Sequence, residues 1–363
     1  MKIRLIIIIF ALVRLYGEAQ TVKRPVIVEP KFHTGMNLPL YRALDYLVED
    51  DIYSFDLSLS FPTYGDDYWE KLYRYPRTGI GLSVTSLGNK EVLGNAWSLF
   101  KFISIPLFEK DRKFSLDYIA SVGCAYLPDA FDIDYNHLNR AIGSHFNLYM
   151  RMGMDFRFFV FPRSEIIIGT AFTHFSNGKT KSPNYGLNIG SVSLGINYLF
   201  NDKGLMLKDP EIPSPGKKYD QSIILSGGLK VYDNLVDIKY FTSSVVYNIE
   251  RRLSNVHKTG LGADFFYDAS IREALASPDG IPEEDFVKHI RFGLHASYAA
   301  QYKRTLFGFQ IGYYLYSEYP LNVNVYNKLS LQYLLTKNIL GSMAIRSHMG
   351  KADCLEFGIG YTW

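Results

Sequence analysis

The chain has 363 residues, of which 47% are hydrophobic and 15% aromatic, and its formal net charge at pH 7 is +3. A chain this apolar can bury a large surface, which excludes low-complexity disorder, and so small a net charge provides no basic field for nucleic acid. No run of roughly 18 apolar residues follows the N-terminal segment, which excludes a helical membrane protein. A soluble β-rich protein and a membrane β-barrel remain.

The first twenty residues predict an export signal. Lys2 and Arg4 precede an unbroken apolar stretch from Leu5 to Val13, and small residues follow at Gly17 and Ala19. The apolar stretch is too short to span a bilayer but has the length of a signal-peptide core. We therefore expect residues 1–20 to be a signal peptide.

Alternation of apolar and polar residues recurs along nearly all of the remaining chain. In residues 53–61 every odd position is apolar and every even position is polar, as in a β-strand with one apolar face. A soluble β-sandwich also alternates, but here the strands are long and aromatic residues gather at their ends, which is typical of outer-membrane strands. Trp363, an aromatic residue at the last outward position, agrees with an outer-membrane insertion signal. We therefore expect an all-β fold, a transmembrane antiparallel β-barrel in the bacterial outer membrane.

The pattern predicts about sixteen strands in two halves of eight. The expected strands lie near residues 27–35, 52–61, 78–87, 95–107, 114–124, 145–160, 165–177, 187–200, 221–232, 238–250, 257–268, 287–300, 304–316, 325–336, 338–348 and 354–363. Residues 21–200 would form the first half and residues 221–363 the second, whose role the pattern does not indicate. Residues 201–220, which hold three prolines, would form the linker. Tandem small barrels and one large barrel with a long turn in its middle both fit.

Generic catalytic and metal-binding motifs do not occur. The chain has no GxSxG, HExxH or Rossmann fingerprint. Cys124 and Cys354 lie outside any CxxC or Cys/His cluster, and the acidic loop with Asp129, Asp132 and Asp134 lacks EF-hand spacing. We expect no cofactor and no metal.

One strand end carries residues suited to chemistry. His174 and Ser176 share the parity of Ile166, Ile168 and Phe172, so both should face lipid, about 7 Å apart along the strand. A polar pair on a lipid face is costly and points to a function. If the first strand rises from the periplasm, this pair lies at the outer leaflet. There Ser176 Oγ could attack an ester carbonyl while His174 removes its proton.

The segment His174-Phe-Ser-Asn177, followed by Pro183-Asn-Tyr-Gly186, resembles the catalytic motif of the PagL-type lipid A 3-O-deacylases, which are acyloxyacyl hydrolase-like outer-membrane barrels. The resemblance is closest over about residues 164–200. It implies supporting roles for Asn177 and Asn184 around the oxyanion or the active-site loop.

The resemblance also implies a third catalytic group. The family has a glutamate twelve residues after the serine, and this position is Asn188 here. An amide can orient histidine but cannot stabilise imidazolium by charge, and neither Glu165 nor Asp155 has the parity to substitute. Either activity is lowered, another acid reaches in from a loop, or catalysis has been lost.

Together these features predict a lipid A deacylase that hydrolyses an ester-linked acyl chain of lipopolysaccharide. Its expected partners are lipid A in the outer leaflet and the membrane itself, without nucleic acid, and a homodimer is left open. The alternative is a non-enzymatic barrel, either a channel or an assembly or adhesion protein. A wide single barrel with a charged lumen would favour a channel, and two narrow filled barrels would favour the enzyme.

Overall fold

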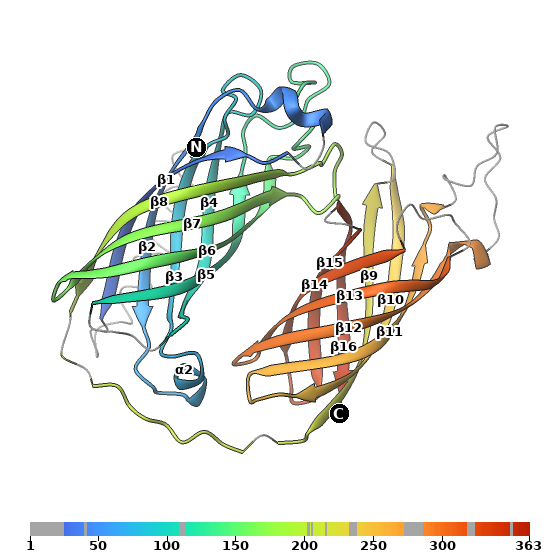
Figure 1. Ribbon diagram of the computed structural model, residues 1–363. Helices are drawn as coiled ribbons and strands as arrows, with labels where there is room; N and C mark the ends of the chain where they lie inside the picture. Colours follow the sequence, from blue (N-terminus) through green and yellow to red (C-terminus); the bar gives the residue numbers. More distant parts are fainter. Residues whose placement is uncertain are drawn as a thin grey trace, which may run out of the picture.

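The chain folds into two closed antiparallel β-barrels of eight strands each (Figure 1). The structure, a computed structural model, describes residues 25–39, 42–108, 113–201, 204, 206–214, 216–231, 238–271, 286–317, 324–348 and 351–363. The all-β barrel prediction and its sixteen strands are confirmed, and of the two arrangements the tandem barrels are correct. The predicted signal peptide, residues 1–20, lies outside the described residues.

Each strand pairs with its neighbours in sequence, and the last strand of each barrel closes on the first. The first barrel comprises β1 (Val26–Asn37), β2 (Ile52–Pro62), β3 (Arg77–Ser86), β4 (Asn95–Pro106), β5 (Phe114–Tyr126), β6 (Phe146–Phe161), β7 (Ser164–Ser176) and β8 (Leu187–Phe200). The second comprises β9 (Tyr219–Val231), β10 (Lys239–Arg252), β11 (His257–Asp268), β12 (Ile290–Tyr302), β13 (Thr305–Ser317), β14 (Val325–Leu334), β15 (Ile339–His348) and β16 (Lys351–Thr362).

In the connections that the structure describes lie three short helices. They are η1 (Arg42–Leu47), α2 (Tyr68–Leu72) and η2 (Phe286–His289). Within the described part of the chain, no helix is long and apolar enough to cross a membrane.

The period-two alternation of the sequence becomes an apolar outside and a polar inside. In β2, the side chains of Tyr53, Phe55 and Leu57 are exposed, whereas Ser54 and Asp56 between them are buried in the lumen. This is the distribution that a lipid-facing wall around a polar interior requires.

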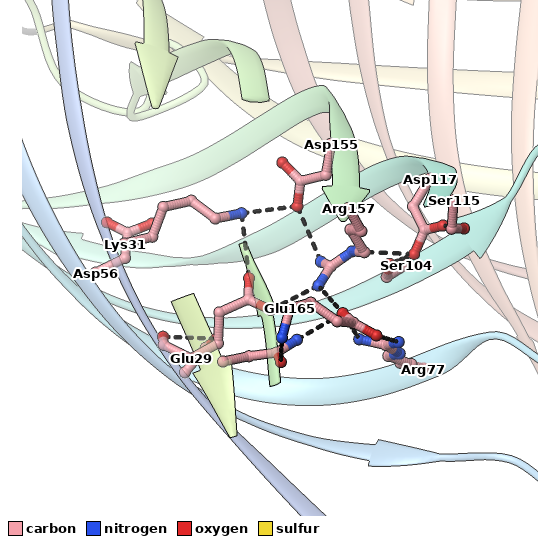
Figure 2. Close-up of polar contacts among 12 residues, drawn as sticks. Glu29, Lys31, Asp56, Arg77, Ser104, Ser115, Asp117, Asp155, Arg157 and Glu165 are labelled. Carbon is pink, nitrogen blue, oxygen red and sulfur yellow. Dashed lines mark hydrogen bonds and ion pairs between the residues drawn. The ribbon is translucent and has the colours of Figure 1, made fainter. Parts of the chain in front are cut away.

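Buried ion pairs fill the lumen of the first barrel (Figure 2). Arg157 lies at the centre, 2.8 Å from Glu29, 2.9 Å from Asp155 and 3.1 Å from Asp117. Arg77 binds Glu165 through two hydrogen bonds. Because charges removed from water are tolerated only when paired, these residues hold one another across the barrel. The cavity beside Arg157 and Asp155 has a free volume of about 40 Å³, enough for one or a few water molecules but not for an open pore.

The second barrel is filled in the same way. Lys230 bridges Asp268 and Asp353 at 2.6 and 2.9 Å, and His295 lies 2.5 Å from Asp264. Both barrels are thus narrow and occupied, which is the arrangement expected of the enzyme rather than of the channel.

One end of the first barrel is sealed by apolar packing. Residues from η1 and from the loops 87–94 and 127–142 cluster over Phe100, Tyr149 and Phe175. The ring of Tyr149 stacks on Phe100 at 5.2 Å and meets Phe175 edge-on at 5.6 Å. The strand end that carries the predicted site is therefore anchored to a rigid core.

Candidate active site

The end of β7 presents His174 and Ser176 outward because Phe175 between them points inward. Phe175 is fully buried in the apolar cluster that seals the barrel, and adjacent strand residues face opposite sides of a sheet. On the outer face, Phe172 and Ile168 precede His174 and are both exposed. The predicted lipid-facing direction of the pair agrees with this arrangement.

His174 lies at the centre of a hydrogen-bonded chain. Its Nε2 is 2.9 Å from Ser176 Oγ, and its Nδ1 is 2.7 Å from Asn188 Oδ1. An amide oxygen can only accept a hydrogen bond. Nδ1 therefore carries the ring proton and donates the hydrogen bond to Asn188 Oδ1. The lone pair of Nε2 is then directed at the serine hydroxyl, as a general base requires.

The strand register brings Asn188 to this position. His174 and Asn188 are directly opposite each other in the β7–β8 ladder, and facing residues of an antiparallel pair have Cβ atoms roughly 5 Å apart. Among the described residues, no carboxylate forms an ion pair with His174, because Glu165 and Asp155 are committed to the lumen. Asn188 is thus the group that orients the imidazole here.

A loop of ten residues, 177–186, covers the serine. Ser176 is only 3% exposed and Asn188 only 5%. Gly186 has a φ of +75°, and a Cβ added there would lie 2.9 Å from His174 Cε1. The backbone therefore passes directly beside the imidazole at a position that requires glycine.

The two predicted supporting residues tie this loop together. The Asn177 N–H donates to Asn184 Oδ1 at 3.0 Å. The Asn177 side-chain amide donates to Ser144 Oγ at 3.0 Å and to the Lys181 carbonyl at 2.9 Å. In contrast, Asn184 Nδ2 is buried and has no hydrogen-bond partner, so it is a donor available to a ligand.

All five residues predicted for the site come together. His174, Ser176 and Asn188 form the hydrogen-bonded chain, and Asn177 and Asn184 form the loop beside it. Sequence reasoning missed the loop 127–145, in which Ser144 binds Asn177 and the Ala141 carbonyl accepts from Gly186 N–H at 3.0 Å. No sequence motif marks this loop, because its contacts arise only when the barrel closes.

The site lies at the end of the barrel that has the longer loops. Loops 127–145 and 177–186 are at this end, whereas β6 and β7 are joined at the other end by residues 162–163 alone. Outer-membrane barrels have short periplasmic turns and longer extracellular loops, which assigns the site to the outer leaflet. Across the described residues, no group of three or more His, Cys, Asp or Glu side chains could hold a metal ion.

Two protein-family models match the chain. Residues 53–197 match the model described as lipid A 3-O-deacylase (PagL), and residues 219–363 match the model described as acyloxyacyl hydrolase, C-terminal domain. A search of the curated proteins finds no match.

The similar solved structures are barrels with low sequence identity to this chain and low TM-scores. Neisserial surface protein A is 11% identical with a TM-score of 0.33 and covers 48% of this chain and 96% of its own. An outer membrane channel from Pseudomonas putida F1 is 7% identical with a TM-score of 0.20 and covers 95% and 97%. A mutant porin of Rh. blastica is 8% identical with a TM-score of 0.20 and covers 93% and 99%. With TM-scores this low, these structures support no inference about function.

Proposed function

Because this chain belongs to the PagL family of bacterial outer-membrane lipid A 3-O-deacylases, we propose that it cleaves an ester-linked acyl chain from lipopolysaccharide with Ser176 as nucleophile and His174 as general base. The observation that carries the proposal is the hydrogen-bonded chain from Asn188 through His174 to Ser176. This hydrogen-bonded chain lies on the lipid-facing side of β7, at the end of the barrel assigned to the outer leaflet and beneath loop 177–186.

The first half of the reaction follows from the tautomer of His174, in which Nδ1 carries the proton and Nε2 is free to accept one. Ser176 Oγ attacks the ester carbonyl carbon while Nε2 takes the hydroxyl proton, which gives a tetrahedral oxyanion and an imidazolium. The intermediate collapses by breaking the bond to the sugar oxygen, and Nε2 returns the proton to that oxygen. The deacylated lipid leaves, and the acyl group stays on Ser176.

The second half repeats the same steps with water. His174 takes a proton from a water molecule, which attacks the acyl-serine carbonyl. The bond to Ser176 Oγ then breaks, the serine recovers its proton from Nε2, and the fatty acid is released. No group outside the chain and water is needed.

Asn184 is suited to stabilise the oxyanion. Its side chain is oriented by the Asn177 N–H, which binds Oδ1 and leaves Nδ2 without a partner. A preoriented donor in a site that excludes water can lower the barrier by about 3 kcal/mol. Asn177 acts through Asn184 as a positioning residue.

The identity of residue 188, an asparagine, determines the turnover that we expect of the enzyme. The Asn188 amide oxygen fixes the tautomer in which Nδ1 is protonated, but an uncharged amide gives the imidazolium less stabilisation than a carboxylate would. We expect a working deacylase with a lower turnover than the same site with glutamate.

The test is mass spectrometry of lipid A from bacteria that express the wild type, Ser176→Ala or His174→Ala. We expect the wild type to remove one ester-linked acyl chain and both variants to leave lipid A intact. Thr170→Ala is the matched control, because Thr170 is exposed on the same face of β7 but lies below the hydrogen-bonded chain. An acylation pattern that is the same in cells with and without the wild-type protein would refute the proposal.

A further inference from the structure

The last hairpin of the second barrel, β15–β16, is the topological counterpart of the β7–β8 hairpin that carries the site. His174 faces Asn188 across β7–β8, and Ile345 faces Leu355 across β15–β16. In β15, Ser347 binds Asn327, and His348 binds Tyr314 Oη at 3.0 Å. In the described part of the second barrel, this hairpin therefore holds no chain of serine, histidine and amide.

These two hairpins meet at the site end of the molecule. A Cβ added at Gly178 would lie 3.3 Å from Leu355 Cβ and 3.8 Å from its Cδ2, so the backbone of the active-site loop rests on Leu355. In Figure 1 the connection between β7 and β8 reaches the ends of β15 and β16. Leu355 is half-buried, whereas Phe357 and Ile359, further along the same outer face, are 58% and 57% exposed.

The next loop residue, Lys179, is partly buried near charged residues of the second barrel. Burial lowers the pKa of Lys179, and the carboxylates of Asp353 and Asp268 partly oppose this change. Both acids belong to the buried cluster around Lys230. Lys179 is therefore within the electrostatic influence of the second barrel, next to the Gly178 contact with Leu355.

A second contact lies at the opposite end of the barrels. The ring of Trp69 in α2 meets Tyr302 edge-on at 4.6 Å, and Tyr73 Oη donates to the Gln301 carbonyl at 3.2 Å. Contacts at both ends restrict tilting of one barrel against the other. They keep β15–β16 opposite the active-site loop.

We infer that the second barrel supports the active site through Leu355, which positions loop 177–186 over Ser176 by contact with Gly178. The inference rests on the proposed function, because the loop holds Asn177 and Asn184. Ordering a loop of this length costs conformational entropy, and Gly178 and Lys179 both adopt positive φ angles of 65° and 66°. The contact with Leu355 stabilises the closed conformation of the loop. A closed loop matters because displacement of catalytic groups by about 1 Å can lower the rate 100-fold.

The test compares Leu355→Ala with Ile359→Ala in the full-length protein. Both changes remove an aliphatic side chain from the outer face of β16, but Leu355 packs against Gly178, whereas Ile359 lies further along the strand and is 57% exposed. We expect Leu355→Ala to lower kcat of lipid A deacylation by about 10-fold or more with little change in KM. Ile359→Ala and the conservative Leu355→Met should retain activity near that of the wild type.

Hydrogen exchange of residues 177–186 gives a readout that does not need catalysis. Leu355→Ala should speed exchange of the Asn177 and Gly186 amides, which are hydrogen-bonded in the closed loop, and Ile359→Ala should not. Wild-type kcat and wild-type exchange in Leu355→Ala would overturn the inference. If the wild type has no deacylase activity, the proposed function fails, while the exchange comparison still decides whether the second barrel holds the loop.

Discussion

Asn188 lies directly opposite His174 in the β7–β8 ladder, and its Oδ1 accepts a hydrogen bond from His174 Nδ1 at 2.7 Å. The position suits a group that orients the imidazole, and a carboxylate there would also stabilise the imidazolium formed during the reaction. We therefore expect Asn188→Glu to raise kcat at least about 10-fold, measured by release of fatty acid from purified lipid A. Asn188→Leu, which cannot accept a hydrogen bond, should lower kcat below that of the wild type. An Asn188→Leu enzyme as fast as the wild type would show that this pair does not contribute to the reaction.

Gly186→Ala should disable the site with little loss of stability. The added Cβ would lie 2.9 Å from His174 Cε1, and the φ of +75° adds strain of about 1 kcal/mol. We expect deacylase activity to fall at least about 10-fold because the imidazole must move away from Ser176. Gly204→Ala is the matched control, because its φ is +62° and nothing lies within 4 Å of the added Cβ. Equal activity in the two variants would contradict this explanation.

Phe175→Ala should destabilise the first barrel. Phe175 is fully buried against Tyr149 in the cluster that seals the barrel, so its removal leaves a cavity and lowers the free energy of unfolding by about 3 kcal/mol or more. Phe172→Ala on the lipid face of the same strand, where the ring is 45% exposed, should change it by less than about 1.5 kcal/mol. Urea unfolding in detergent, followed by loss of heat-modifiable gel mobility, measures both. A larger effect at Phe172 would reverse the assigned directions of the two rings.

The purified protein should not conduct ions. The cavity beside Arg157 in the first lumen has a free volume of about 40 Å³, which is too small for a hydrated ion to pass. The second lumen is occupied by the ion pairs of Lys230 with Asp268 and Asp353. Planar-bilayer recordings should therefore show no conductance steps of the size of an open porin, which serves as the control. Steady porin-like steps from the wild type would restore the channel as a candidate function.

Much of the site could be predicted from local pattern. Period-two alternation fixes the two faces of a strand, so the outward direction of His174 and Ser176 follows from the parity they share with Ile168 and Phe172. The same reasoning excluded Glu165 and Asp155, which the structure places in the lumen with Arg77 and Arg157.

The contacts around the loop could not be predicted. Ser144 binds Asn177 across 33 positions of sequence, and Leu355 meets Gly178 from the other barrel. Such contacts depend on how loops fold over a closed barrel, and no periodicity in the chain encodes them.

The sequence by itself determined that the chain is built of about sixteen strands with a lipid-facing side, and that His174 and Ser176 lie on that side of their strand. Only the tertiary structure decided that these strands close as two barrels rather than one, and that Leu355 of the second barrel packs against the loop over the site in the first. The physical reason is that alternation is a property of each strand alone. Closure depends on which strand pairs with β1, and β8 and β16 present the same local pattern of apolar and polar residues.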